Sequence, residues 1–171
     1  MVQKVFLGLK QTIKKTNVTL SYKDLFKTSR KWFTDRAYDV WEIEADEMDM
    51  GSGKKKYHIF WKCDRRIAYY AKIRFEYGID FVAEDVVIED KGKQKTMQKG
   101  DITIGFNPYI MKDVEDEWTV QEKSGLRRFL REAYDMFFEK NKYKAMEEDM
   151  KKDLDTIKYD MKRYINQKRL D

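Results

Sequence analysis

The sequence predicts a single α+β domain: an antiparallel meander of about five to six strands packed on an N-terminal amphipathic helix and a C-terminal helix, with a further charged C-terminal helix. Two observations predict this class. Apolar and polar side chains alternate from 67 to 81, which is typical of a strand with one buried face. The other strand-like segments follow one another without helical segments between them, which favours an antiparallel sheet.

The size and composition of the chain are those of one folded unit. It has 171 residues, of which 42% are hydrophobic and 15% aromatic, so it has enough large side chains for a core. Charged residues make up 39% and would coat that core heavily. We expect an α+β domain over 1–141 and an amphipathic helical extension over 142–171.

Cysteine usage and hydropathy bear on the compartment. Cys63 is the only cysteine, so no disulfide can form within the chain, and no cysteine–histidine pair has zinc spacing. The apolar run at 5–9 is too short for a signal-peptide core, and no stretch of ~18 apolar residues is present to span a bilayer. We therefore expect a cytoplasmic protein with no cofactor and no transmembrane segment.

The N-terminal region contains the first helix. Residues 2–13 alternate loosely and fit either a strand or a short helix. Ser21 is typical of an N-cap, and Asp24 stands in the first turn that would follow. Apolar residues then recur at helical spacing, which predicts an amphipathic helix over 21–37; its stripe is Leu25, Ser29, Trp32 or Phe33, and Arg36.

From Asp39 the period drops to two. Trp41, Ile43 and Ala45 alternate with Glu42, Glu44 and Asp46, which predicts a strand with an acidic, solvent-facing side. The glycines of 51–53 predict a turn, because glycine enters positive φ cheaply. The returning strand would place these side chains on one face: Tyr57, Ile59, Trp61 and Cys63. Residues 64–66 are expected to form the next corner.

The strand over 67–81 is expected to be the centre of the core. Its apolar set comprises every odd residue: Ile67, Tyr69, Ala71, Ile73, Phe75, Tyr77, Ile79 and Phe81. A further strand is expected at 86–88 and a hairpin turn at 90–93. The partner strand carries Ile102, Ile104 and Phe106, and Pro108 would end it before a last extended piece at 109–114.

Two helices are expected at the C-terminal end. Thr119 and Glu122 fit a capping box, followed by a helix over 124–140. The final helix concentrates its apolar residues on one narrow seam: Tyr143, Met146, Met150, Leu154, Ile157, Met161, and Tyr164 or Ile165. This seam needs a partner surface. The chain's own sheet and a second chain both fit, so residues 143–165 are a candidate oligomer contact.

No set of residues predicts catalysis or metal binding. His58 is the only histidine and has no nucleophile beside it, and Cys63 is expected to pack as a small hydrophobic residue. The acidic residues Glu42, Glu44 and Asp46 are expected to be solvated rather than to bind a cation. The sequence therefore favours a non-enzymatic binding or interaction protein.

Charge alternates in blocks along the chain. Residues 1–36 hold nine Lys/Arg and two Asp/Glu, whereas 37–53 hold six Asp/Glu and no Lys/Arg. Opposite blocks can pair across neighbouring strands, and the basic ones can also bind an anionic partner. The alternative function is therefore an RNA- or ribosome-associated protein, with this nucleic-acid-binding set: Lys27, Arg30, Lys31, Arg127, Arg128 and Arg131.

The order of the predicted elements resembles the helix-grip arrangement of START-like lipid-binding domains. This is a resemblance of topology, carried by a helix, several antiparallel strands and a closing helix. It implies a curved sheet around the helix of 124–140 and an apolar cavity lined by Trp41, Trp61, Tyr69, Ile73 and Phe75. The expected partner is then an apolar ligand or a protein at the sheet–helix interface or at the C-terminal helix.

Overall fold

The computed structural model describes residues 3–6, 9–68, 71–112 and 140–167. The strands are β1 (Gln3–Phe6), β2 (Gln11–Leu20), β3 (Asp39–Gly51), β4 (Lys54–Ala68), β5 (Ala71–Asp90) and β6 (Lys93–Lys112). The helices are α1 (Tyr22–Asp35) and α3 (Lys140–Gln167). The predicted α+β class with an antiparallel sheet is confirmed.

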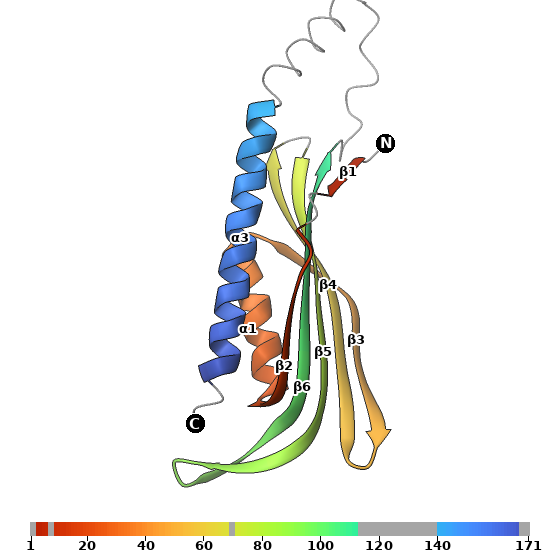
Figure 1. Ribbon diagram of the computed structural model, residues 1–171, viewed down its shortest axis with the longest axis vertical. Coiled ribbons are helices and arrows are strands. Elements are labelled where there is room, and N and C mark those ends of the chain that lie inside the picture. The colour runs from red at the N-terminus through yellow and green to blue at the C-terminus, as the bar shows by residue number, and fades with distance from the viewer. Residues whose placement is uncertain (1–2, 7–8, 69–70, 113–139, 168–171) are drawn as a thin grey trace, which may run out of the picture.

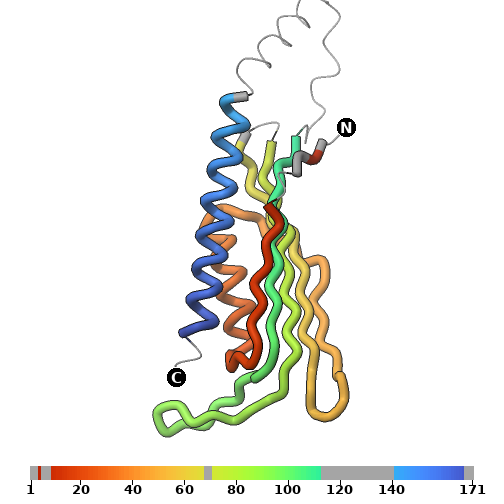
Figure 2. The backbone as a smooth tube through the Cα atoms, viewed as in Figure 1, coloured from red at the N-terminus to blue at the C-terminus, as the bar shows by residue number. Residues whose placement is uncertain are grey.

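All strand pairs are antiparallel and form one sheet in the order β1-β6-β5-β4-β3, with β2 also paired to β6. The open question at the N-terminus is thus answered by two strands, β1 and β2, along the same edge of β6. The two helices lie on one face of the sheet and run in opposite directions (Figures 1 and 2). Figure 1 also places β3 at the edge of the sheet farthest from β2.

Helix α1 begins as predicted. The backbone amide of Asp24 donates to Ser21 Oγ at 3.2 Å, which satisfies one of the free amides of the first turn. Its buried side chains are Leu25, Ser29, Trp32 and Phe33. Arg36 is the C-cap, and its guanidinium lies over the Trp32 ring at 4.0 Å. The apolar stripe faces the sheet and α3, so the amphipathic pattern determines which face of α1 is buried.

The predicted single strand over 67–81 is wrong. Strand β4 ends at Ala68 and β5 begins at Ala71, and these two residues pair with each other, so the chain reverses between them. The expected corner at 64–66 instead lies inside β4. The alternation misleads because the odd positions remain apolar across the reversal. From Ala71 to Ala83, however, every odd residue is buried, as the alternation predicts.

Strands β5 and β6 form a longer hairpin than expected. The segment 86–88 continues β5 and is not a separate strand, and β6 passes through Pro108 to Lys112 and does not end at the proline. The turn at 90–93 is confirmed, with positive φ at Lys91 and Gly92. Beyond Glu84 and Gln98 this hairpin has no third strand beside it in the register, and Figure 1 shows it curving toward the helical side.

One hydrophobic core fills the layer between the sheet and the two helices. Its largest fully buried side chains come from α1 and the central strands, among them Phe33, Trp61, Tyr77, Phe75 and Phe81. Edge-to-face aromatic pairs join the layers: Phe33 lies 5.3 Å from Tyr77 and 5.9 Å from Phe75, measured between ring centroids.

Helix α3 belongs to this core. Met146, Met150, Leu154, Ile157, Met161 and Ile165 are all at most 6% exposed. These six residues of the seam are therefore covered by the chain's own sheet and α1. The division into a domain over 1–141 and a helical extension over 142–171 stays a prediction; the structure shows that the seam of α3 packs in the core. Residues 124–139 of the helix expected over 124–140 lie outside the described residues, and Lys140 begins α3.

Candidate protein-binding edge

Strand β3 is the most exposed part of the sheet. Every residue from Asp39 to Gly51 is exposed except Val40, which is half-buried. Strand β4 pairs with one edge of β3, and within the described ranges no strand pairs with the other edge. The backbone groups along that free edge thus face solvent, and we call this strand with its side chains the β3 edge.

The start of β3 is fixed by a link to both helices. Ala37 adopts a positive φ of 59° and redirects the chain after α1. The next residue, Tyr38, is buried, packs against Phe33 and donates from its hydroxyl to Asp153 Oδ2 at 2.7 Å. Burial, followed by this hydrogen bond, raises the pKa of Tyr38 above its ordinary value. The β3 edge therefore projects from a rigid base.

A bulge at Ile43 decides which way the side chains of β3 point. The register pairs Glu42 with Trp61 and then Glu44 with Phe60, so one residue is skipped. On the face shared with the core residues of β4 stand Val40, Glu42, Ala45, Glu47 and Asp49. On the opposite, outer face stand Trp41, Glu44, Asp46 and Met48.

Large apolar side chains are exposed along β3. The exposed fractions are 61% for Trp41, 48% for Ile43, 46% for Met48 and 58% for Met50. A free edge that only avoids aggregation is usually short and carries charges without large apolar groups. The combination here is typical of a contact surface.

The acidic side chains of β3 are only partly neutralised within the chain. Arg30 lies 3.9 Å from Glu42, and Lys55 lies 2.8 Å from Glu47. Within the described residues, no Lys or Arg forms an ion pair with Asp46. The edge thus keeps a negative potential.

His58 joins three strands on the outer face. Its Nδ1 lies 2.8 Å from Asp80 of β5 and its Nε2 lies 3.1 Å from Glu44 of β3. The hydrogen bond with Asp80 raises the pKa of His58, burial opposes this, and Glu44 adds to the increase. Because the two carboxylates flank opposite ring nitrogens, the three groups do not converge on a common point for a metal ion. No group of three or more metal-ligating side chains is found in the part of the chain that the structure describes.

The expected ligand-lining residues do not form one set. Trp61, Ile73 and Phe75 are fully buried in the core, and Tyr69 lies outside the described residues. Trp41 was expected to face the core, but it lies on the outer, solvent face, because the bulge separates its face from that of Ala45. The indole N–H of Trp61 has no hydrogen-bond partner in the described structure. Cys63 is buried beside these residues, and burial raises the pKa of its thiol.

The expected nucleic-acid-binding residues are divided as well. Lys27, Arg30 and Lys31 are exposed on α1, but Lys31 pairs with Asp35 at 2.7 Å and Arg30 faces Glu42. Arg127, Arg128 and Arg131 lie outside the described residues.

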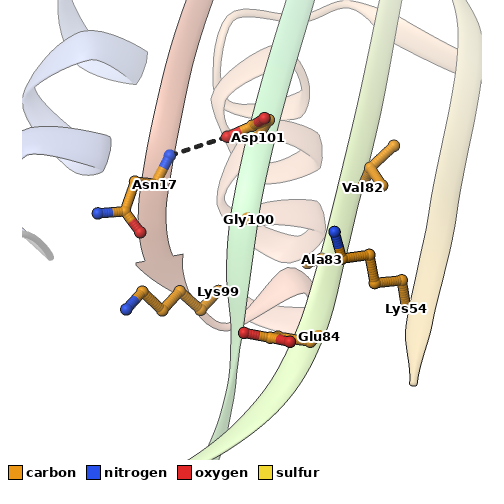
Figure 3. Close-up of a pocket in the computed structure, with 8 residues that line it drawn as sticks. All are labelled: Asn17, Lys54, Val82, Ala83, Glu84, Lys99, Gly100 and Asp101. Carbon is orange, nitrogen blue, oxygen red and sulfur yellow. Dashed lines mark hydrogen bonds between the residues drawn. The ribbon is translucent and has the colours of Figure 1, made fainter. Parts of the chain in front are cut away.

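A shallow hollow of about 190 Å³ lies where the β5–β6 hairpin bends (Figure 3). Gly100 allows this bend, because a Cβ there would clash with the backbone of Val82 and Ala83. Two lysines and two acids line the hollow. One of the acids, Asp101, already accepts a hydrogen bond at Oδ1 from the backbone amide of Asn17 at 2.9 Å. The balanced charges favour no particular ligand.

The sequence predicted only part of the β3 edge. The acidic block and the strand were predicted, but the exposure of both faces was not. The signal that points to it is that acids occupy positions of both parities between Asp39 and Asp49. No protein-family model, curated protein or solved structure matches the chain. Among the described residues, no helix is long and apolar enough to cross a membrane.

Proposed function

We propose that this chain is a non-enzymatic interaction protein that takes an extended segment of a partner protein as an additional strand along the β3 edge. The observation that supports it is that β3 combines an edge unpaired within the described chain with exposed Trp41, Ile43, Met48 and Met50. In strand addition, main-chain hydrogen bonds supply affinity and alternate side chains supply specificity.

The regular part of β3 limits where the partner can pair. Between the register shifts at 42/44 and 49/51, residues 44–49 pair with β4 without interruption. In an antiparallel ladder, neighbouring residues direct their amides to opposite sides. Half of the amides in 44–49 therefore point away from β4 and can receive the added strand.

A displayed library of extended peptides, screened against the full chain, tests this function. Asp46→Pro and Glu47→Pro form a matched pair, because one removes an amide that bonds β4 and the other an amide at the free edge. The variant that loses the free-edge amide breaks no bond to β4, so it should keep the wild-type melting temperature. We expect this variant to no longer bind the selected peptides. Unchanged binding by that variant, or no binder at all, would refute strand addition.

The buried indole N–H of Trp61 supports a second role. We propose that the chain is helix-grip-like and that the filled layer near Trp61 opens to admit an apolar molecule with one acceptor group. An unpaired buried donor costs about 1–3 kcal/mol, which a ligand or water acceptor would recover. A medium-chain alcohol should raise the melting temperature of the wild type and have a smaller effect on Trp61→Phe; equal effects would refute this role.

RNA binding has less support, because Arg30 and Lys31 face acids within the chain. A cytoplasmic location stays part of the proposal, and the unpaired, buried Cys63 supports a reducing compartment.

A further inference from the structure

The charges on the β3 edge restrict which segments can bind there. Between Asp39 and Gly51 the sequence holds six Asp/Glu and no Lys/Arg. The bulge distributes them over both faces, with Glu44 and Asp46 on the outer face and Glu42, Glu47 and Asp49 on the inner one. Any added strand therefore meets carboxylates on both of its faces.

We infer that the partner segment is basic and extended, with Lys or Arg on both faces and apolar residues at the two ends of its outer face; this inference rests on the proposed function. Directly opposite side chains on neighbouring strands lie about 4.5–5.5 Å apart at Cβ, so each base can reach a carboxylate of β3. Charge complementarity of this kind selects partners and speeds their encounter.

The outer face of β3 specifies the order of side chains in the partner. Along it stand Trp41, Glu44, Asp46 and Met48. Trp41 and Met48 are 61% and 46% exposed, so apolar partner residues can cover them, and basic residues would face the two acids between them. Asp46 offers a carboxylate without an ion-pair partner among the described residues.

The same charges disfavour other occupants. Pairing of two β3 strands from two copies would set acids opposite acids, which destabilises a ladder. A nucleic acid or an anionic membrane surface carries the same sign as the edge and would be repelled.

The experiment compares two synthetic peptides on the full chain. One has pairs of neighbouring lysines separated by pairs of threonines, which places lysine on both faces of an extended strand, and has valine at both ends; the other has glutamate in place of each lysine. We expect the lysine peptide to bind about tenfold more tightly, because several exposed ion pairs each contribute only a modest factor. Its affinity should fall as salt rises, because exposed charges are screened.

Charge reversal supplies the matched control. The double variant Glu44→Lys with Asp46→Lys should remove most of the preference, whereas Glu89→Lys with Asp90→Lys makes the same net change at exposed positions far along β5 and should leave it unchanged. Equal binding of both peptides to the wild type, or the same loss of preference in the Glu89/Asp90 variant, would overturn the inference. If the inference fails in this way, strand addition itself is still supported when library peptides bind the wild type and do not bind the proline variant that keeps its melting temperature.

Discussion

The hydroxyl of Tyr38 donates a 2.7 Å hydrogen bond to Asp153, which ties the first turn before β3 to the middle of α3. Asp153 is 8% exposed and also forms an ion pair with Arg65, whose Nη2 lies 2.9 Å from Asp153 Oδ2. The Arg65 guanidinium lies 4.8 Å from the Tyr38 ring centroid. These three residues join α3, β4 and the base of β3 in one polar cluster.

Tyr38→Phe tests this cluster. It removes one donor to a buried carboxylate and leaves the ring in place, so we expect a loss of about 1.5–3 kcal/mol in the free energy of unfolding. Urea unfolding at neutral pH measures it. Tyr159→Phe on the same helix is the control, because Tyr159 is 64% exposed. Equal stability of wild type and Tyr38→Phe would contradict the role given to this bond.

Local patterns predicted much of this fold. Ser21 acts as the N-cap, the stripe of α1 is buried, and the seam of α3 packs as amphipathicity requires. These features depend on residues close in sequence, whose periodicity is set by backbone geometry. The class of the sheet followed from the same reasoning.

The errors arose where periodicity carries no information. Strand alternation does not reveal a reversal that preserves parity, as between Ala68 and Ala71. A bulge shifts parity without a sequence mark, so Trp41 was placed on the wrong face. Exposure of the β3 edge depends on which strand becomes the edge, and strand order is a property of the whole sheet.

The core and the β3 edge respond differently to truncation of an aromatic side chain. Phe75 is fully buried, so Phe75→Ala should lower the free energy of unfolding by about 3–5 kcal/mol. Trp41→Ala should change stability by less than about 0.5 kcal/mol, because the side chain is mostly in water. Chemical denaturation compares the two. A large loss for Trp41→Ala would show that it is packed rather than available to a partner.

Helix α3 should be required for the stability of the domain. Leu154 is 1% exposed in the core, and Leu154→Ala should cost about 2–5 kcal/mol. Asp155→Ala, at the neighbouring exposed position, should cost little. An unchanged melting temperature for Leu154→Ala would instead indicate that the seam is free and that residues 143–165 serve a partner.

Asp64 should make stability depend on pH in the acid range. Burial raises its pKa, but hydrogen bonds from Arg74 at 2.6 Å and Lys72 at 2.6 Å outweigh this and lower it. A lowered pKa gives stability that is present above the unfolded value and lost as pH falls through the folded one. Asp64→Asn should therefore be less stable than wild type at pH 7, with the gap closing below about pH 4. A constant gap from neutral to acid pH would contradict this.

His58 should act in the opposite direction. Hydrogen bonds with Asp80 and Glu44 raise its pKa, so the charged ring stabilises the fold below the unfolded pKa, and this is lost as pH rises through the folded one. The neighbouring charges on the outer face are Glu44, Asp46, Asp80 and Lys56, which lies 3.4 Å from Asp80. Because these groups are partly exposed, the contribution should be about 0.2–1 kcal/mol.

Comparison of wild type with His58→Gln measures this, because glutamine does not titrate. The wild type should be the more stable protein near pH 5.5, and the difference should disappear near pH 8. Protonated His58 also forms an ion pair with Glu44 and neutralises its charge, so a lysine peptide should bind the wild type more weakly at the lower pH. If the affinity of His58→Gln for that peptide shows the same pH dependence as the wild type, His58 does not control the charge of the β3 edge.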